Sequence, residues 1–113
     1  MTTTVTDEEM RSLLPTAKEY TAVILKSGPN RHMAGVDAII WEHGRRNFAL
    51  HADGLLPIVC PIADGSEVHG VGILDLGLDE ARKIMEDDPG VQAGVFVYEL
   101  HTCRSFPGST LPG

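Results

Sequence analysis

The sequence predicts a single α+β domain in which strands and helices follow the order β-α-β-β-α-β. Four short segments are rich in β-branched and apolar residues, and two segments between them carry apolar residues at helical spacing. Clusters of Gly, Pro and Asp separate these segments. The chain has 113 residues, of which 42% are hydrophobic and 22% charged, which suits one globular domain with its own core.

The first 25 residues are predicted to form an extension followed by a strand. We treat residues 1–19 as an N-terminal extension, in which the acidic run from Asp7 favours a short helix that Pro15 would end. The first strand is predicted at 20–25, because YTAVIL is rich in β-branched and aromatic residues and the turn sequence SGPN follows it closely.

The longer helix is predicted over residues 38–53. Asp37 is its expected N-cap, and Gly54 is expected to adopt a left-handed conformation just after its end. At about 100° per residue, its apolar side chains share one arc, and that arc also carries His43 and Asn47. Two polar residues on an apolar helix face are the first anomaly of the sequence.

The second half of the chain is predicted to supply the remaining elements. These are strands at 55–62, 69–76 and 95–103, a helix at 78–87, and an irregular tail at 104–113. Two prolines restrict the first of these strands to an edge of the sheet. Pro89 is expected to stop the helix, with Asp88 at the end of its apolar arc. The tail is expected to dock through Phe106 and Leu111.

This order of elements is that of the ferredoxin-like fold, an antiparallel four-stranded sheet with both helices on one face. The domain proper would span 20–103. Two helices cannot cover both faces of such a sheet, and few aromatic residues are present, at 5% of the chain. The uncovered face therefore predicts a homodimer.

Charge and motif content exclude several classes of function. Nine basic and sixteen acidic residues give a net charge of −7, which argues against binding to nucleic acid or to an anionic membrane. No apolar run is long enough for a transmembrane helix, the N-terminus lacks the pattern of a signal peptide, and only two cysteines occur. We therefore expect a cytoplasmic protein. The five histidines lack metal-ligand spacing and no nucleotide motif occurs, so no metal or cofactor is expected.

His43 and Asp88 are the candidate catalytic pair. Each lies on the apolar arc of its helix, so the two side chains can meet if both helices pack on the same sheet face. A carboxylate beside an imidazole fixes its tautomer and stabilises its protonated form, which suits general acid or base chemistry near neutral pH. The alternative is that His43 is a hydrogen-bonded core residue and Asp88 a turn residue before proline.

The stretch HGRRNFALHADGLLPIVCPIADG (43–65), followed by HGVGILDLGLDEARKIMEDDPGVQAG (69–94), resembles the YCII-related domain family. His43 matches the family histidine, Gly54 the glycine that ends the helix, and Asp88-Pro89 the family Asp-Pro. The resemblance covers about residues 20–103 and implies a dimeric ferredoxin-like protein whose His and Asp face a cleft. It also implies proton transfer on a small phenolic or enolisable molecule, since one branch of the family eliminates chloride from a chlorinated hydroxyhydroquinone.

The sequence departs from the family pattern at three places. Cys60 stands where the family has Gly before Pro, which would place a thiol at the cleft edge, although a buried cysteine in an apolar strand is otherwise a small hydrophobic residue. Gly44 and Asn47 replace bulky apolar residues, and Asn47 is a candidate substrate ligand. The family arginine just before the histidine is missing, and the nearest preceding one, Arg31, has no assigned role.

Three functions remain open from the sequence. The first is an enzyme that uses the His43–Asp88 pair for elimination, isomerisation or related lyase chemistry on a small carbonyl or phenolic substrate. The second is a module that binds a small molecule, or assists another enzyme, without catalysis. The third is a structural role in which the pair only stabilises the fold. Arg45 and Arg46 would suit an anionic ligand, but both are expected on the solvent-facing arc of the helix.

Overall fold

The protein is described here by a computed structural model that places residues 3–113. Residues 1–2, the start of the predicted N-terminal extension, lie outside the described residues. Along the chain the elements are α1 (Asp7–Leu13), the 3-10 turn η1 (Leu14–Thr16), β1 (Lys18–Ser27), α2 (Val36–Ala52), β2 (Ile58–Pro61), β3 (Val68–Leu74), α3 (Leu78–Glu86), α4 (Pro89–Gln92) and β4 (Phe96–Ser105).

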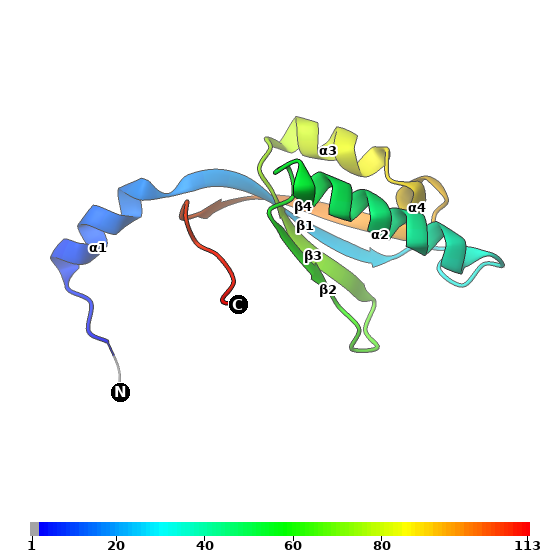
Figure 1. Ribbon diagram of the computed structural model, residues 1–113, viewed down its shortest axis with the longest axis horizontal. Helices are drawn as coiled ribbons and strands as arrows, with labels where there is room; N and C mark the ends of the chain where they lie inside the picture. Colours follow the sequence, from blue (N-terminus) through cyan, green and yellow to red (C-terminus); the bar gives the residue numbers. More distant parts are fainter. Residues whose placement is uncertain (1–2) are drawn as a thin grey trace.

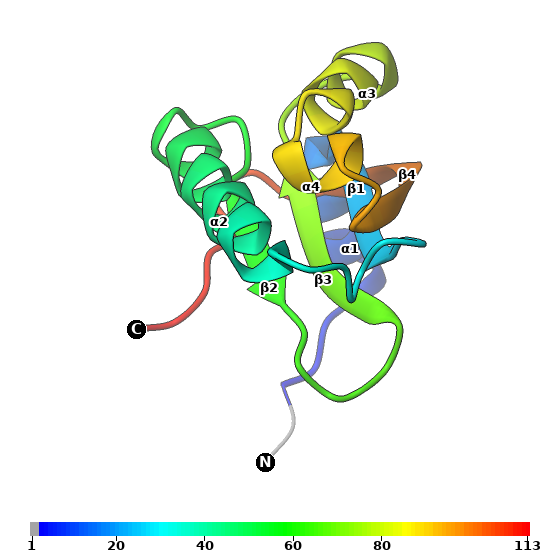
Figure 2. The ribbon, with the colours of Figure 1, turned by 90° about the vertical axis from the view of Figure 1, so that its right-hand side faces the viewer.

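The four strands form one open antiparallel sheet with the spatial order β2-β3-β1-β4. Helices α2, α3 and α4 lie together on one face of this sheet, as two views at right angles show (Figures 1 and 2). The protein is therefore an α+β fold built on an antiparallel sheet. Helix α1 stands away from the sheet at the far end of a long β1 (Figure 1).

The longer helix begins earlier than the sequence predicted. Its N-cap is Gly35, at a φ of 78°, and Asp37 lies inside the first turn, so the prediction of Asp37 as N-cap is wrong. The left-handed conformation of Gly35 lets the chain turn sharply into the helix, which no other residue type adopts as readily. At the other end Gly54 has a φ of 77°, which confirms the left-handed glycine expected after the helix.

Strand β2 is shorter than the predicted strand at 55–62. The backbone N–H groups of Leu55 and Leu56 both donate to the Leu50 carbonyl and so belong to the end of α2. Pro57, which has no N–H, follows directly. Pairing with β3 therefore begins only at Ile58. The sheet-edge position that the prolines predicted is confirmed by the strand order.

Pro89 ends one helix and also begins another. α3 closes at Glu86, and the predicted stop is followed at once by the short helix α4, with Pro89 in its first turn. Asp88 caps α4, because its Oδ2 accepts the backbone N–H groups of Gly90 at 2.9 Å and Val91 at 3.2 Å. This cap fixes the position of the Asp88 carboxylate between the two helices.

The hydrophobic core lies between the helices and the sheet. It is formed by Val23, Leu25, Leu56, Leu74, Ala81, Met85, Val95 and Phe96. The C-terminal tail does not join this core, since Phe106 is 41% and Leu111 is 69% exposed. The expectation that both residues dock the tail is therefore wrong, and β4 itself continues to Ser105, beyond its predicted end.

Candidate functional site

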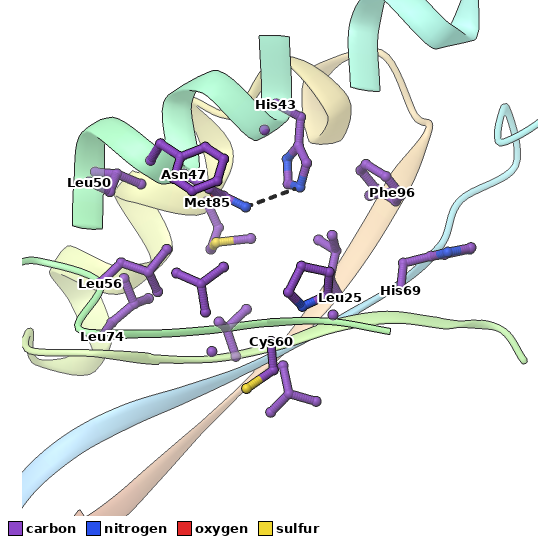
Figure 3. Close-up of a pocket in the computed structure, with 18 of the residues that line it drawn as sticks. Leu25, His43, Asn47, Leu50, Leu56, Cys60, His69, Leu74, Met85 and Phe96 are labelled. Atoms are coloured by element: carbon purple, nitrogen blue, oxygen red, sulfur yellow. Dashed lines mark hydrogen bonds between the residues drawn. The ribbon is translucent and has the colours of Figure 1, made fainter. Parts of the chain in front are cut away.

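A cavity of about 300 Å³ lies between α2 and the inner face of the sheet. Most of its lining is apolar and comes from α2, α3 and all four strands. The polar side chains on its wall come from Arg31, His43, Asn47 and His69. A small, mostly apolar cavity with a few convergent polar groups is the usual form of a small-molecule site. Figure 3 shows His43 and Asn47 reaching into it from α2 above and His69 rising from the sheet side.

His43 and Asp88 meet as the sequence predicted. The Nδ1 atom of His43 lies 2.8 Å from Oδ1 and 2.9 Å from Oδ2 of Asp88. Both residues are buried, His43 at 9% and Asp88 at 1% exposure. An ionised carboxylate can only accept hydrogen bonds, so Nδ1 of the imidazole carries the proton and donates it.

Asp88 is held as a carboxylate by its donors. Burial by itself would raise its pKa, but the hydrogen bond and charge of His43 and the backbone N–H groups of Val91 and Gly90 outweigh burial and lower the pKa below its ordinary value of 3.8. Arg46 adds a positive charge, with Nη1 3.7 Å from Oδ1. The expectation that Arg46 faces solvent is wrong, because its long side chain reaches back to Asp88 and is only 24% exposed.

The second nitrogen of His43 faces the cavity. Its Nε2 lies 3.3 Å from the amide nitrogen of Asn47, one helical turn along α2 (Figure 3). With Nδ1 protonated, Nε2 of the neutral ring is an acceptor, and the Asn47 amide donates to it. The Phe96 ring packs against the imidazole, with 4.8 Å between their centroids. Asp88, Asn47 and Phe96 therefore fix the orientation of the imidazole, and the lone pair of Nε2 faces the cavity.

His69 reaches the cavity because β3 contains a bulge. Strand β1 pairs Leu25 with Gly70 but Lys26 with Val68, so His69 is an extra residue without a partner. Its Nε2 lies 2.6 Å from the Ser27 hydroxyl oxygen. Burial, followed by the nearby charges of Arg31 and His32, lowers the pKa of His69 below its ordinary value. No role for this histidine could be predicted from the sequence, because strict strand alternation does not predict a bulge.

Arg31, to which the sequence assigned no role, also borders the cavity. Its Nε atom is buried and has no hydrogen-bond partner among the described residues. A buried, unsatisfied guanidinium nitrogen is uncommon in folded proteins. The only sequence signal for this residue was its position in the loop before α2.

Cys60 lies on the cavity wall, but its thiol points away from His43 (Figure 3). Cys60 is exposed, and its sulfur lies on the side of β2 and β3 away from His43 (Figure 3). Its neighbours Val59 and Pro61 pair with the cavity-lining Gly72 and Gly70, so strand alternation turns the thiol outward. The alternative that Cys60 is a buried hydrophobic residue is therefore wrong, and its role as a contact at the cleft edge stays a prediction. Arg45 is exposed as expected and pairs with Glu42 at 3.1 Å.

Two further findings concern the described part of the chain. Residues 3–113 contain no group of three or more His, Cys, Asp or Glu side chains arranged to hold a metal ion. Within the same residues, every helix falls short of the length and apolar character that crossing a membrane would require.

Comparison with known proteins adds no relative. No protein-family model matches the chain, and no curated protein is similar to it in sequence. The geometry of the cavity and its polar side chains is therefore the basis for assigning a function.

The lowered pKa of Asp88 predicts a specific loss of stability in acid. A carboxylate whose pKa is lower in the folded state stabilises the fold above its unfolded pKa, and this contribution disappears as the pH falls through the folded pKa. We expect Asp88→Asn to lose about 1–3 kcal/mol of unfolding free energy at neutral pH. Its stability should then change less than that of the wild type below about pH 4.

Urea denaturation measured over a series of pH values tests this prediction. Asp79→Asn, in the first turn of α3, makes the same chemical change at an exposed carboxylate and is the control. Stability curves of wild type and Asp88→Asn that run parallel down to low pH would contradict the role given to the Asp88 carboxylate.

Proposed function

We propose that the protein is an enzyme in which His43 transfers a proton to or from a small carbonyl or phenolic molecule. The observation that carries the proposal is the 2.8 Å contact of His43 Nδ1 with a buried, capped Asp88, which leaves Nε2 facing the cavity. A positioned imidazole of this kind is the usual general acid or base in enzymes. Elimination, isomerisation and related lyase reactions all need such a step.

The proton would move between the substrate and His43 Nε2. When Nε2 takes a proton from a carbon beside a carbonyl, or from a phenol, the imidazole becomes a cation. The adjacent Asp88 carboxylate compensates that charge without having to move. Asn47 would release Nε2 and donate its amide hydrogen to the oxygen on which negative charge develops. His43 and Asp88 are thus the proposed catalytic pair, and Asn47 the proposed substrate ligand.

The YCII-related family and the ferredoxin-like fold remain our proposed classification. The strand order β2-β3-β1-β4, with the helices on one face, supports it. So does the contact between the two residues that the resemblance paired, His43 and Asp88. The two free cysteines suit a reducing compartment, and we propose the cytoplasm.

We also propose that two copies pair through the uncovered face of the sheet. Strand pairing places apolar side chains together on that face, from Ala22, Ile24, Ile58, Val71 and Ile73. Val97 lies on the same face, beside the ion pair of Lys26 and Glu99 that borders this patch. Val71 is 37% and Val97 is 45% exposed. A contiguous apolar patch of this kind usually marks an interface, and a twofold dimer would bury it on both copies at once.

The second candidate function is a module that binds a small molecule without converting it. The mostly apolar lining of the cavity favours it, because such walls bind a ligand whether or not chemistry follows. In that case the His43–Asp88 pair orients a ligand, and the bound compound is recovered unchanged after long incubation.

Replacement of His43 tests the catalytic proposal directly. Wild-type protein in D₂O should exchange the hydrogens beside the carbonyl of 2-oxobutyrate or phenylpyruvate, as followed by proton NMR. We expect His43→Gln to slow this exchange by at least about a hundredfold, the lower range for loss of a general base. His101→Gln, at an exposed histidine on β4, is the matched control and should keep the wild-type rate. Equal rates in wild type and His43→Gln would contradict the mechanism.

A charge placed on the uncovered sheet face tests the proposed dimer. We expect the wild type to sediment as a dimer and Val71→Lys as a monomer, because burying an unpaired ammonium group at an interface is strongly unfavourable. Trp41→Ser removes an exposed aromatic residue from α2 instead, and it should leave the mass unchanged. A wild-type monomer, or a dimer that survives Val71→Lys and dissociates with Trp41→Ser, would overturn this interface.

A further inference from the structure

Acidic side chains are missing from the described lining of the cavity, whereas basic residues are present. The chain has sixteen acidic residues, yet no Asp or Glu is among the described residues that line the cavity. Arg31, His43 and His69 do line it. Of these three, Arg31 carries a fixed positive charge, so in a protein with a net charge of −7 its end of the cavity is locally positive.

Arg31 is the charge within this cavity that lacks a partner. No ion pair or hydrogen bond joins its guanidinium group to another residue of the described chain, and its Nε is buried. By contrast, Arg46 is close to Asp88 and Arg45 pairs with Glu42. A guanidinium group presents Nε–H and an Nη–H side by side, which matches the two oxygens of a carboxylate. Arg31 lines the cavity and its Nε–H is unused, so its guanidinium group can supply a carboxylate-binding fork.

The two ends of the cavity are joined by an apolar wall. Phe96 stands between the two imidazoles, with centroid distances of 4.8 Å to His43 and 5.5 Å to His69. Arg31 lies on the His69 side, because the turn that carries it follows Ser27, whose hydroxyl contacts His69. Gly70 lies on the sheet side of the cavity, where the lack of a side chain leaves room for the body of a ligand.

We propose that the cavity takes a small carboxylate, whose anionic group pairs with Arg31 while its apolar or aromatic body lies along Phe96 toward His43. This inference rests on the proposed function and deepens it, because it names the class of molecule that the proton-transfer site would hold. A carboxylate at Arg31 would leave the other end of the molecule beside His43 Nε2, where the reacting carbon or phenolic oxygen belongs. It would also supply the hydrogen-bond partner that the buried Nε lacks.

Benzoate and benzamide are a matched pair of probes for this inference. They have the same ring and nearly the same shape, and only benzoate carries the charge. We expect benzoate to bind wild-type protein at least about tenfold more tightly than benzamide, the usual size of a charge-assisted hydrogen bond. The imidazole signals of both His69 and His43 in NMR spectra should shift on binding. Arg31→Gln should remove the preference for benzoate, and Arg31→Lys should keep part of it.

Arg45→Gln is the control for the change in net charge, because Arg45 is exposed and outside this cavity. It should leave both affinities unchanged. Equal affinities for benzoate and benzamide, a preference that survives Arg31→Gln, or no benzoate binding at all would each overturn the inference. The result is separable from the proposed catalysis: His43→Gln should abolish hydrogen exchange yet keep the benzoate preference. Exchange that persists while Arg31→Gln has no effect would refute only the carboxylate inference.

Discussion

The buried carboxylate of Asp88 is the group on which the site depends. A charge that is 1% exposed is stable only if donors replace the water it has lost, and here His43 and the backbone of α4 do so. Because these donors come from two helices, satisfying one carboxylate also fixes how α2 packs against the α3–α4 junction. The same contacts choose the tautomer of His43 and aim its free nitrogen at the cavity. The hydrogen bonds of Asp88 therefore determine both the packing of the helices and the proposed chemistry of His43.

The cavity exists because the sheet lacks a side chain where β3 faces α2. Gly70 and Gly72 face α2 from β3, and a larger residue at Gly70 would fill the space between sheet and helix. A Cβ at Gly72 would already meet Leu56 Cδ1 at 3.1 Å, whereas one at Gly70 would find only ordinary contacts from 3.6 Å outward. The bulge at His69 then turns an imidazole into that space. The strand that creates the room thus also supplies one of its polar groups.

The sequence was enough to predict the pair and its neighbour Asn47, but not the other polar groups of the cavity. Helical periodicity was enough for His43 and Asp88, because a polar residue on an apolar arc is visible in the sequence alone. It failed for Arg46, whose Cα lies off the arc but whose long side chain bends back to the carboxylate. It failed for His69, because one extra residue in a strand reverses the facing that alternation predicts. The short helix α4 was missed since Pro89 was treated only as a stop, although proline also favours a helix's first turn.

The most direct test of this account is the tautomer of His43, measured by long-range proton–nitrogen NMR of the neutral imidazole. The account predicts the Nδ1–H form in the wild type, since the Asp88 carboxylate can only accept. In Asp88→Asn the side-chain oxygen is retained by the N–H groups of α4, so the new amide nitrogen faces His43 and should switch the ring to the Nε2–H form. Finding Nε2–H in the wild type, or the same tautomer in both proteins, would contradict the claim that Asp88 sets the chemistry of this cavity.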